Sequence, residues 1–155
     1  MAFDAAAVRG LFDQVQSHAM TLGLFDMVTG HEPKSAPGNG LWCAIWVQDI
    51  SPMGSISGLN ATSGRVTLNV RCGKSFISSP EDGIDPDILT AVTTLMGDYS
   101  GAFTLGGTVR NIDLLGQSGQ ALSAQAGYVT VDTKMYRVME IVLPVLINDL
   151  WTQTP

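Results

Sequence analysis

The side chains with the broadest catalytic chemistry in this sequence are two histidines, His18 and His31, and two cysteines, Cys43 and Cys72. A nucleophilic enzyme needs a Ser, Cys or Thr beside a base, which is usually histidine. His18 lies on or beside an apolar stripe with helical spacing, and His31 precedes Glu32 in a stretch rich in proline and glycine. Neither histidine adjoins a nucleophile motif, and no Gly-x-Ser-x-Gly sequence is present. We therefore predict structural roles for both histidines and no catalytic residue.

Metal and nucleotide sites are not predicted either. Tetrahedral zinc needs three or four clustered ligands, and the two cysteines lie in separate strand patterns far from the histidines. The fragment CGKS at 72–75 has the ending of a phosphate-binding loop, but Leu68 occupies the position of its first glycine. The acidic run EDGIDPD at 81–87 lacks the spacing of an EF-hand, so a solvated loop with a helix cap is the preferred interpretation. We expect no cofactor and no metal.

Two carboxylates on predicted strands, Glu140 and Asp113, keep one enzymatic alternative open. A pair of carboxylates can act as general acid and base. The sequence does not identify a second carboxylate that would pair with either residue. A single acidic residue in a strand usually pairs with an arginine. A small carboxylate-dependent enzyme is therefore an alternative from a different class, and the main expectation is a protein that is not an enzyme.

Cys43 and Cys72 each lie inside an apolar strand pattern, which predicts two buried thiols that are neighbours across strands. A disulfide is the alternative. The first residues, MAFDAAAVRG, lack a basic segment followed by an apolar stretch, so no oxidising compartment is implied. No run of about 18 apolar residues occurs, so no membrane contact is expected. The sequence predicts a protein that is made and kept in a cytoplasm.

Charge is sparse in this chain. Only 14% of its 155 residues are charged, against about 25% in an average soluble domain, while 45% are hydrophobic. This length predicts one domain, residues 1–155. A surface with so little charge can be buried against copies of the chain or against partners. The net charge of −6 predicts no general attraction to nucleic acid, although a neutral or negative wall suits a passage through which DNA slides.

The pattern of apolar residues predicts two helices and five strands. Their order is helix, two strands, helix and three strands. This order describes an α+β domain with an antiparallel or mixed β-sheet flanked by two α-helices. The predicted segments are a helix at 4–22 that stops at Gly23, a loop at 29–40, a strand at 41–50, a connection at 51–63, a strand at 64–72, a helix with Asp85 as cap, strands near 103–115 and 121–132, a turn at 116–120 and a last strand reaching residue 147.

Most of the predicted strands carry apolar residues on both faces, which requires cover by helices or by another subunit. The strand at 64–72 differs, because its outward positions are polar and predict a half-solvated strand. The predicted faces are Leu41, Cys43, Ile45 and Val47 against Trp42, Ala44, Trp46 and Ile50; Val66, Leu68, Val70 and Cys72 against Arg65, Thr67, Asn69 and Arg71; and Met135, Arg137, Met139, Ile141 and Leu143 against Tyr136, Val138, Glu140 and Val142. The second helix has an apolar stripe of Ile84, Ile88, Leu89, Val92, Leu95, Met96 and Tyr99.

Four residues are candidates for an intersubunit contact: Trp42, Trp46, Arg65 and Arg71. The two tryptophans lie four apart on one strand face, where core packing is preferred over an intersubunit contact. The two arginines lie on the polar face of the next strand. They can meet an acidic neighbour within the chain or across an interface, and a solvated surface is the preferred interpretation.

The overall layout resembles the tail terminator proteins of bacteriophages with long non-contractile tails, especially those of actinobacterial hosts. The resemblance covers almost the whole chain and rests on pattern and arrangement, since none of its segments is a catalytic signature. The segments are HEPKSAP at 31–37, GLWCAIWVQDISPM at 40–53, SGLNATSGRVTLNVR at 57–71, DGIDPDILTAVTTLMGDYSG at 82–101 and FTLGGTVRNIDLLG at 103–116.

The resemblance implies a small α+β subunit that forms a hexameric ring on the head-proximal end of the tail tube. Such a ring stops polymerisation of the tube and joins the tail to the head. Its implied partners are the tail tube protein on one face and a head-completion or stopper protein on the other, while DNA passes through the lumen without specific binding. The implied location is the head–tail junction of the virion, after assembly in the host cytoplasm. A head–tail connector or neck protein, or a tail tube subunit, is the runner-up within this class.

Overall fold

The computed structural model describes residues 2–34, 37–38, 40–53, 61–77, 81–100, 111–117 and 119–152. The described chain forms a β-sheet flanked by two α-helices, which confirms the predicted α+β class. The elements are β1 (Ala2–Phe3), α1 (Ala5–Thr21), β2 (Met27–Thr29), β3 (Trp42–Pro52), β4 (Ala61–Ser75), a 3-10 turn (Glu81–Gly83), α2 (Ile84–Ser100), β5 (Asn111–Ile112), β6 (Ser123–Val131) and β7 (Lys134–Thr152).

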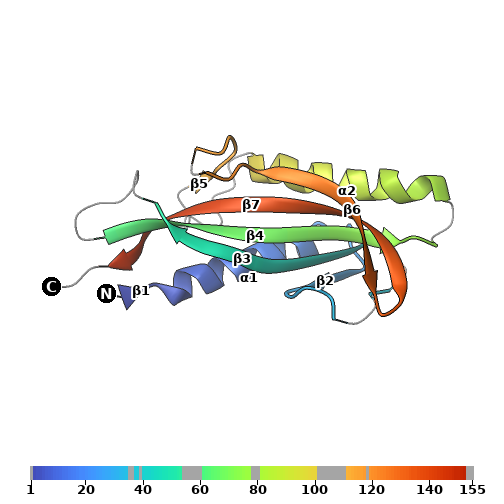
Figure 1. The fold of residues 1–155 in the computed structure, drawn as a ribbon, viewed down its shortest axis with the longest axis horizontal. Helices are drawn as coiled ribbons and strands as arrows, with labels where there is room; N and C mark the ends of the chain where they lie inside the picture. Colours follow the sequence, from blue (N-terminus) through green and yellow to red (C-terminus); the bar gives the residue numbers. More distant parts are fainter. Residues whose placement is uncertain are drawn as a thin grey trace.

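Three long strands form the centre of the sheet, and β4 lies between β3 and β7 (Figure 1). β6 and β5 pair with β7, β1 pairs with the end of β7, and β2 pairs with the beginning of β3. The described pairs are antiparallel except β2 with β3, so the sheet is mixed. The three-residue strand β2 falls partly in the segment that was predicted as a loop.

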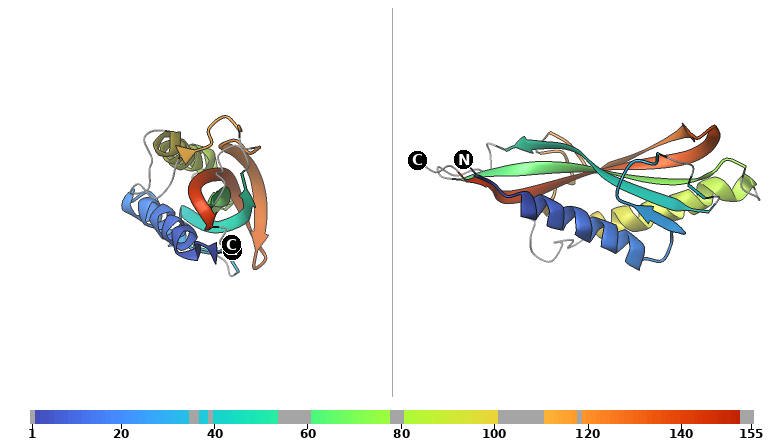
Figure 2. Two further views of the ribbon diagram at one scale, coloured as in Figure 1. Left: turned by 90° about the vertical axis from the view of Figure 1, so that its left-hand side faces the viewer. Right: turned by 90° about the horizontal axis from the view of Figure 1, so that it is seen from below.

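Both helices cover the same face of the sheet, as the view from below in Figure 2 shows. α1 begins where predicted, because the Asp4 carboxylate accepts a hydrogen bond from the backbone N–H of Ala7 at 3.1 Å. It ends at Thr21 with Leu22 as the cap, and Gly23 follows with a φ of +68°, the left-handed conformation that favours glycine. Leu11, Val15 and Ala19 are its buried residues and face the sheet.

α2 differs from its prediction in two respects. It begins at Ile84 after a 3-10 turn, so Asp85 lies in the first helical turn and is not the cap. Its carboxylate accepts a hydrogen bond from Arg137 Nε at 3.0 Å. Leu89 was assigned to the apolar stripe but is 52% exposed, because the buried face follows Ile88 and Val92 and leaves Leu89 on the outer side.

The main core lies between the two helices and the sheet, and a smaller cluster lies on the opposite face. Strand alternation sends the two sets to opposite sides. The buried apolar residues that β3, β4 and β7 contribute to the main core are Cys43, Ile45, Val66, Leu68, Val70, Cys72, Ile141, Leu143, Val145, Ile147 and Leu150. The smaller cluster consists of Trp42, Ala44, Tyr136 and Val138. Both faces of β7 therefore carry buried apolar residues, as predicted.

The prediction that β4 is half-solvated is wrong. Thr67 and Asn69 were placed on the solvated face, yet they are only 1% and 7% exposed. Arg65 and Arg71 are also largely covered, with side chains 16% and 12% exposed. β4 is the central strand, so side chains of β3 and β7 flank its outward residues; Arg71, for example, contacts Trp46, Glu140 and Glu32.

β3 contains a β-bulge that the alternation rule does not anticipate. Val47 pairs with Leu68 and Asp49 pairs with Thr67, so Gln48 is the extra residue. Ile50 consequently pairs with Val66 and lies on the face that the helices cover. The prediction that Ile50 shares a face with Trp42 is therefore wrong.

Several boundaries in the rest of the chain also shift. β3 and β4 extend to Pro52 and from Ala61, so part of the predicted 51–63 connection is strand, and 54–60 lie outside the described residues. Of the strand predicted near 103–115 only β5 is described, because 101–110 lie outside the described residues. The predicted turn at 116–120 is present as a hydrogen bond from Gly119 N to Gly116 O at 2.9 Å.

The β6–β7 hairpin turn predicts a stabilising substitution. Asp132 and Thr133 form a two-residue loop in which both φ angles are positive, +53° and +67°. A β-branched residue is costly there, so Thr133→Gly should raise the free energy of unfolding by about 1 kcal/mol in urea denaturation. Thr130→Gly, at an exposed strand position of the same hairpin, should lower it by about 1 kcal/mol. Equal effects of the two glycines would contradict this account of the turn.

Candidate functional site

The sheet face opposite the helices carries a charged cluster centred on Arg71. The Arg71 guanidinium donates from Nε and Nη2 to Glu140 Oε2, at 3.2 and 3.0 Å, and from Nη1 to Glu32 Oε1 at 3.3 Å. The Arg71 Cζ atom lies 4.8 Å from the centre of a Trp46 ring, which is a cation–π contact. The guanidinium is thus held on three sides by two carboxylates and an aromatic ring.

The strand registers explain how these residues meet. Arg71 on β4 lies directly opposite Glu140 on β7 and directly opposite Ala44 on β3, two residues before Trp46. Cross-strand neighbours on one face interact in this way in antiparallel sheets. Glu32 comes from the segment after β2, which folds over the same face. The sequence signals the pairing of Glu140 with an arginine, but nothing in the local pattern indicates Glu32.

A hollow on this face, which we call the Arg71 trough, extends from the cluster over β6 and β7. One part has a volume of about 450 Å³ and is lined by Glu32, Lys34, Arg71, Val129 and Val131 among others. The adjoining part, of about 250 Å³, shares Val129 and adds Val138, Glu140 and Val142. The trough therefore combines valine side chains with charges that are held in place by ion pairs.

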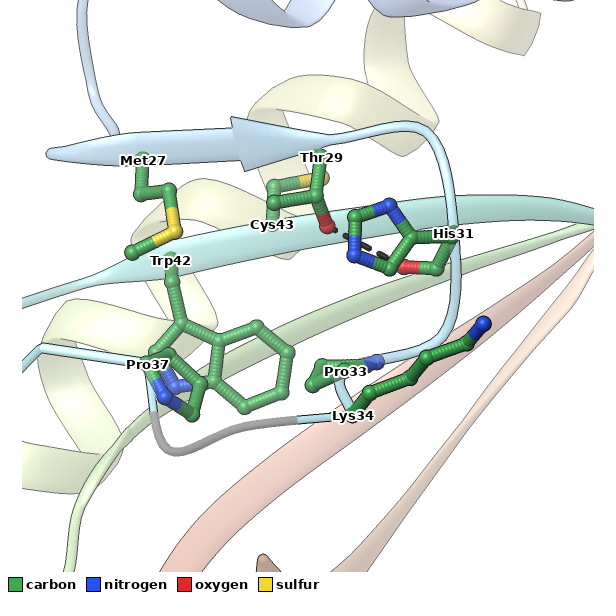
Figure 3. A pocket seen from close by; sticks show the side chains of 8 residues that line it. All are labelled: Met27, Thr29, His31, Pro33, Lys34, Pro37, Trp42 and Cys43. Atoms are coloured by element: carbon green, nitrogen blue, oxygen red, sulfur yellow. Dashed lines mark hydrogen bonds between the residues drawn. The ribbon is translucent and has the colours of Figure 1, made fainter.

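A second pocket of about 250 Å³ lies beside Trp42 (Figure 3). Met27, Thr29 and Cys43 line it from the β2–β3 side, and His31, Pro33, Lys34 and Pro37 line it from the segment between these strands. The Thr29 hydroxyl donates to the His31 carbonyl at 3.1 Å, which fixes the bend of that segment. Tyr136 attaches the segment to β7, because its hydroxyl donates to the Pro37 carbonyl at 2.7 Å.

Tyr136 gives the protein a predicted alkaline limit. Burial, with a smaller contribution from the Asp132 charge, raises the pKa of the Tyr136 phenol above its ordinary value of 10.0. A raised phenol pKa stabilises the fold fully below about pH 10, and this contribution is lost as the pH rises further. Tyr136→Phe should cost about 1 kcal/mol at pH 7 and reduce the loss of stability between pH 9 and 11, measured by urea denaturation. An unchanged alkaline loss in Tyr136→Phe would contradict the assignment.

The two histidines lie in different parts of the fold. His18 Nε2 and Asp98 Oδ2 are 3.0 Å apart, so this contact connects α1 to α2. The His18 ring also lies 5.9 Å from that of Tyr99. His31 is exposed and lines the pocket beside Trp42.

The two carboxylates of the enzymatic alternative lie apart. Glu140 accepts two of the three hydrogen bonds that Arg71 donates, as expected for a single acidic residue in a strand. Asp113 is 4% exposed and accepts from the backbone N–H groups of Gly116 and Gln117, each at 3.0 Å, which makes it the anchor of a turn. The backbone N–H of Asp113 donates to the carbonyl of Pro144. Pro144 lies four residues beyond Glu140 on β7, which corresponds to about 13 Å along the strand.

The motifs set aside in the sequence have structural places. CGKS lies within β4, where Lys74 forms an ion pair with Asp87. EDGIDPD forms the 3-10 turn and the first turn of α2. Across the described ranges no group of three or more potential ligands is arranged to hold a metal ion. Neither described helix is long and apolar enough to span a bilayer.

The four candidate contact residues separate into two kinds. Trp42 is 2% exposed and packs edge-on against Tyr136, with ring centres 5.8 Å apart, so it belongs to the core of the subunit. Trp46 and Arg71 reach the surface in part, at the Arg71 trough and at a groove of about 440 Å³ that Trp46 shares with α1. Arg65 also reaches it in part and lies 3.9 Å from Asp49.

What the Arg71 cluster can do chemically is hold charge in a fixed place. The guanidinium is already satisfied by two carboxylates and an aromatic ring, so within the chain its role is to tie β4 to β7 and to the segment after β2. Comparison with models of known protein families and with curated protein sequences finds no match for this chain.

Proposed function

We propose that this protein is a structural component of a phage virion, a tail terminator that forms a ring on the head-proximal end of the tail tube. The proposal rests on the resemblance of most of the chain to that family. The observation that carries it furthest is the Arg71 trough, a hollow of partly exposed valines and fixed charges on one sheet face. Partly exposed apolar side chains on one sheet face give a partner apolar area to bury.

Exposed apolar side chains on several elements support assembly as well. A monomer rarely exposes large contiguous apolar areas without a partner. The described large apolar residues with substantial exposure are Phe3, Met20, Met27, Val47, Ile50, Phe76, Ile77, Leu89, Leu114, Leu115, Tyr128 and Met135. Four of them lie close together: Phe76 and Ile77 directly after β4, Tyr128 on β6 and Met135 on β7.

A ring explains how such a protein would end a polymer. Each subunit uses two different surfaces, and the ring closes when the rotation between subunits divides the circle. We propose six subunits, with the tail tube protein on one face and a head-completion protein on the other. The net charge of −6 suits a lumen through which DNA slides without being held. The protein would then work without catalysis, at the head–tail junction of the virion.

A neck protein or a tail tube subunit is the second candidate, and the way the protein polymerises distinguishes them. A tube subunit stacks on itself without limit, whereas a terminator stops as one ring. Light scattering of the purified protein over a range of concentrations, with negative-stain images of the same sample, tests this difference. Single rings of about six subunits would support the assignment as a terminator. Stacked tubes of indefinite length would instead identify the protein as a tail tube subunit.

Trp46 is the residue whose replacement should most clearly separate assembly from folding. It is partly exposed, lies under Arg71 and lines the groove beside α1. Trp46→Glu should place a charge in an apolar contact and reduce ring formation or control of tail length at least tenfold, about 1.4 kcal/mol or more. Thr93→Glu, at an exposed position of α2 outside this groove, is the control. Normal circular dichroism and normal tail length in Trp46→Glu would count against a role in assembly.

A further inference from the structure

Cys43 and Cys72 form a buried pair of thiols in the middle of the sheet. They lie directly opposite each other in the antiparallel β3–β4 ladder, and both are free. Each is 0% exposed, so neither side chain reaches solvent in the folded protein. Both belong to the main core beneath the helices, on the face opposite the Arg71 trough.

The spacing of this pair is already that of a disulfide. Directly opposed residues of antiparallel strands have Cα atoms about 4.5 or 5.5 Å apart. Disulfides join residues whose Cα atoms are about 4.4 to 6.8 Å apart. The Cα spacing of a directly opposed pair is therefore compatible with a bond between the two sulfur atoms.

We propose that Cys43 and Cys72 are a redox modification site that forms an intrachain disulfide in contact with a small disulfide oxidant. One cysteine thiolate attacks a sulfur of the oxidant and releases one reduced thiol, which leaves a mixed disulfide on the protein. The second cysteine thiolate then displaces the other half of the oxidant. The protein loses two electrons and two protons, and the oxidant leaves as two reduced thiols.

Burial makes this site slow and selective. The pKa of the Cys72 thiol is raised well above its ordinary value of 9.0. The largest cause is a hydrogen bond with the Cys43 side chain, followed by burial and by the charge of Cys43. Because the thiolate is the attacking species, reaction awaits opening of the core. Once one sulfur has reacted, its nearest thiol is the partner directly across the ladder, so closure within the chain is faster than reaction with another molecule.

The bond would distinguish two environments. A reducing cytoplasm keeps both thiols free, whereas an oxidising exterior permits the bond. The bond closes the loop between β3 and β4 and should raise the Tm by about 10 °C, because it restricts the unfolded chain. The biological use we infer rests on the proposed function. Subunits assembled in the host would each be stabilised by the intrachain bond after the particle is released.

The test is prolonged incubation of the folded protein with oxidised glutathione, followed by intact mass, peptide mapping and thermal denaturation. We expect loss of two hydrogen atoms, a peptide that joins Cys43 to Cys72, and a higher Tm that a reductant reverses. Cys43→Ala and Cys72→Ala should each prevent the bond. Peptide mapping of the original chain keeps the test valid if either variant fails to fold.

Three results would overturn the proposal. These are stable glutathione adducts without the intrachain bond, links between different chains, and thiols that stay free after the whole incubation. A bond that lowers the Tm would likewise overturn it. The oligomeric state of the same oxidised and reduced samples, measured by light scattering, judges the proposed ring separately.

Discussion

Gly73→Ala should lower the free energy of unfolding by about 2–3 kcal/mol, although it adds a single methyl group. Gly73 lies directly opposite Trp42 in the β3–β4 ladder. A Cβ atom at this position would lie 2.4 Å from Trp42 Cζ2 and 2.6 Å from Cε2. Movement of the indole away from the new methyl group would disturb its packing, because Trp42 is 2% exposed and packs edge-on against Tyr136. Urea denaturation monitored by tryptophan fluorescence would measure the loss.

Gly127→Ala provides the matched control. Gly127 is also a strand glycine, on β6, but a Cβ there would meet no atom within 4 Å. This substitution should be neutral or stabilise by about 0.5–1 kcal/mol, because glycine loses more backbone freedom on folding than alanine does. Trp42→Phe should restore part of the stability of Gly73→Ala by removing the clashing ring atoms. Equal stability of the two alanine variants would contradict the packing of Trp42 over Gly73.

Arg71→Met should cost about 2–3 kcal/mol, the second large effect that the structure predicts. The substitution keeps an unbranched side chain against Trp46 but leaves Glu140 without its cation. Removal of one partner costs about 3–5 kcal/mol for a fully buried pair and less than 1 kcal/mol for an exposed pair. The Arg71 and Glu140 side chains are 12% and 29% exposed, so the expected value lies between these limits. Urea denaturation at neutral pH would measure it.

Lys74→Met is the control for Arg71→Met, because it removes a cation from the same strand. The partner of Lys74 is Asp87, whose side chain is 52% exposed, so the expected cost is below about 1 kcal/mol. Adding Glu140→Gln to Arg71→Met should recover at least about 1 kcal/mol, since the uncompensated carboxylate is then removed. A double variant no more stable than Arg71→Met would mean that Glu140 is not the group destabilised by the loss of Arg71.

Local signals in the sequence predict the helices and the main core well. Asp4 and Gly23 bound α1 because the first can accept from a free N–H and the second can adopt a positive φ. Val66, Leu68 and Val70 are fully buried as their alternation indicates. The cross-strand placement of Cys43 and Cys72 also follows from their positions in two neighbouring strand patterns.

The remaining features depend on contacts between distant parts of the chain. The bulge at Gln48 moves Ile50 to the opposite face of the sheet. A strict alternation of faces along the sequence does not predict where one extra residue is inserted. The polar side chains of Thr67 and Asn69 suggested exposure to solvent. They are buried because other parts of the folded chain cover them, and a local pattern does not contain that information. Glu32 reaches Arg71 from 39 positions away, and no spacing rule connects them.

The candidate site was therefore only partly predictable. Arg71 and Trp46 were identified as possible contact residues, and the structure brings them together with Glu140 and Glu32. The trough itself arises because β6 folds back along β7 and the segment after β2 crosses the same face. This arrangement is a property of the tertiary structure, and the role that we assign to it is a proposal about assembly.

The most direct test of that proposal is an arrest assay on growing tail tubes. Purified protein would be added to tail tube protein during polymerisation, and tube lengths would be measured by electron microscopy with and without it. The account predicts shorter tubes as the protein concentration rises, each with one ring of this protein at a single end. Unchanged lengths, with no protein bound to either end at saturating concentration, would contradict it.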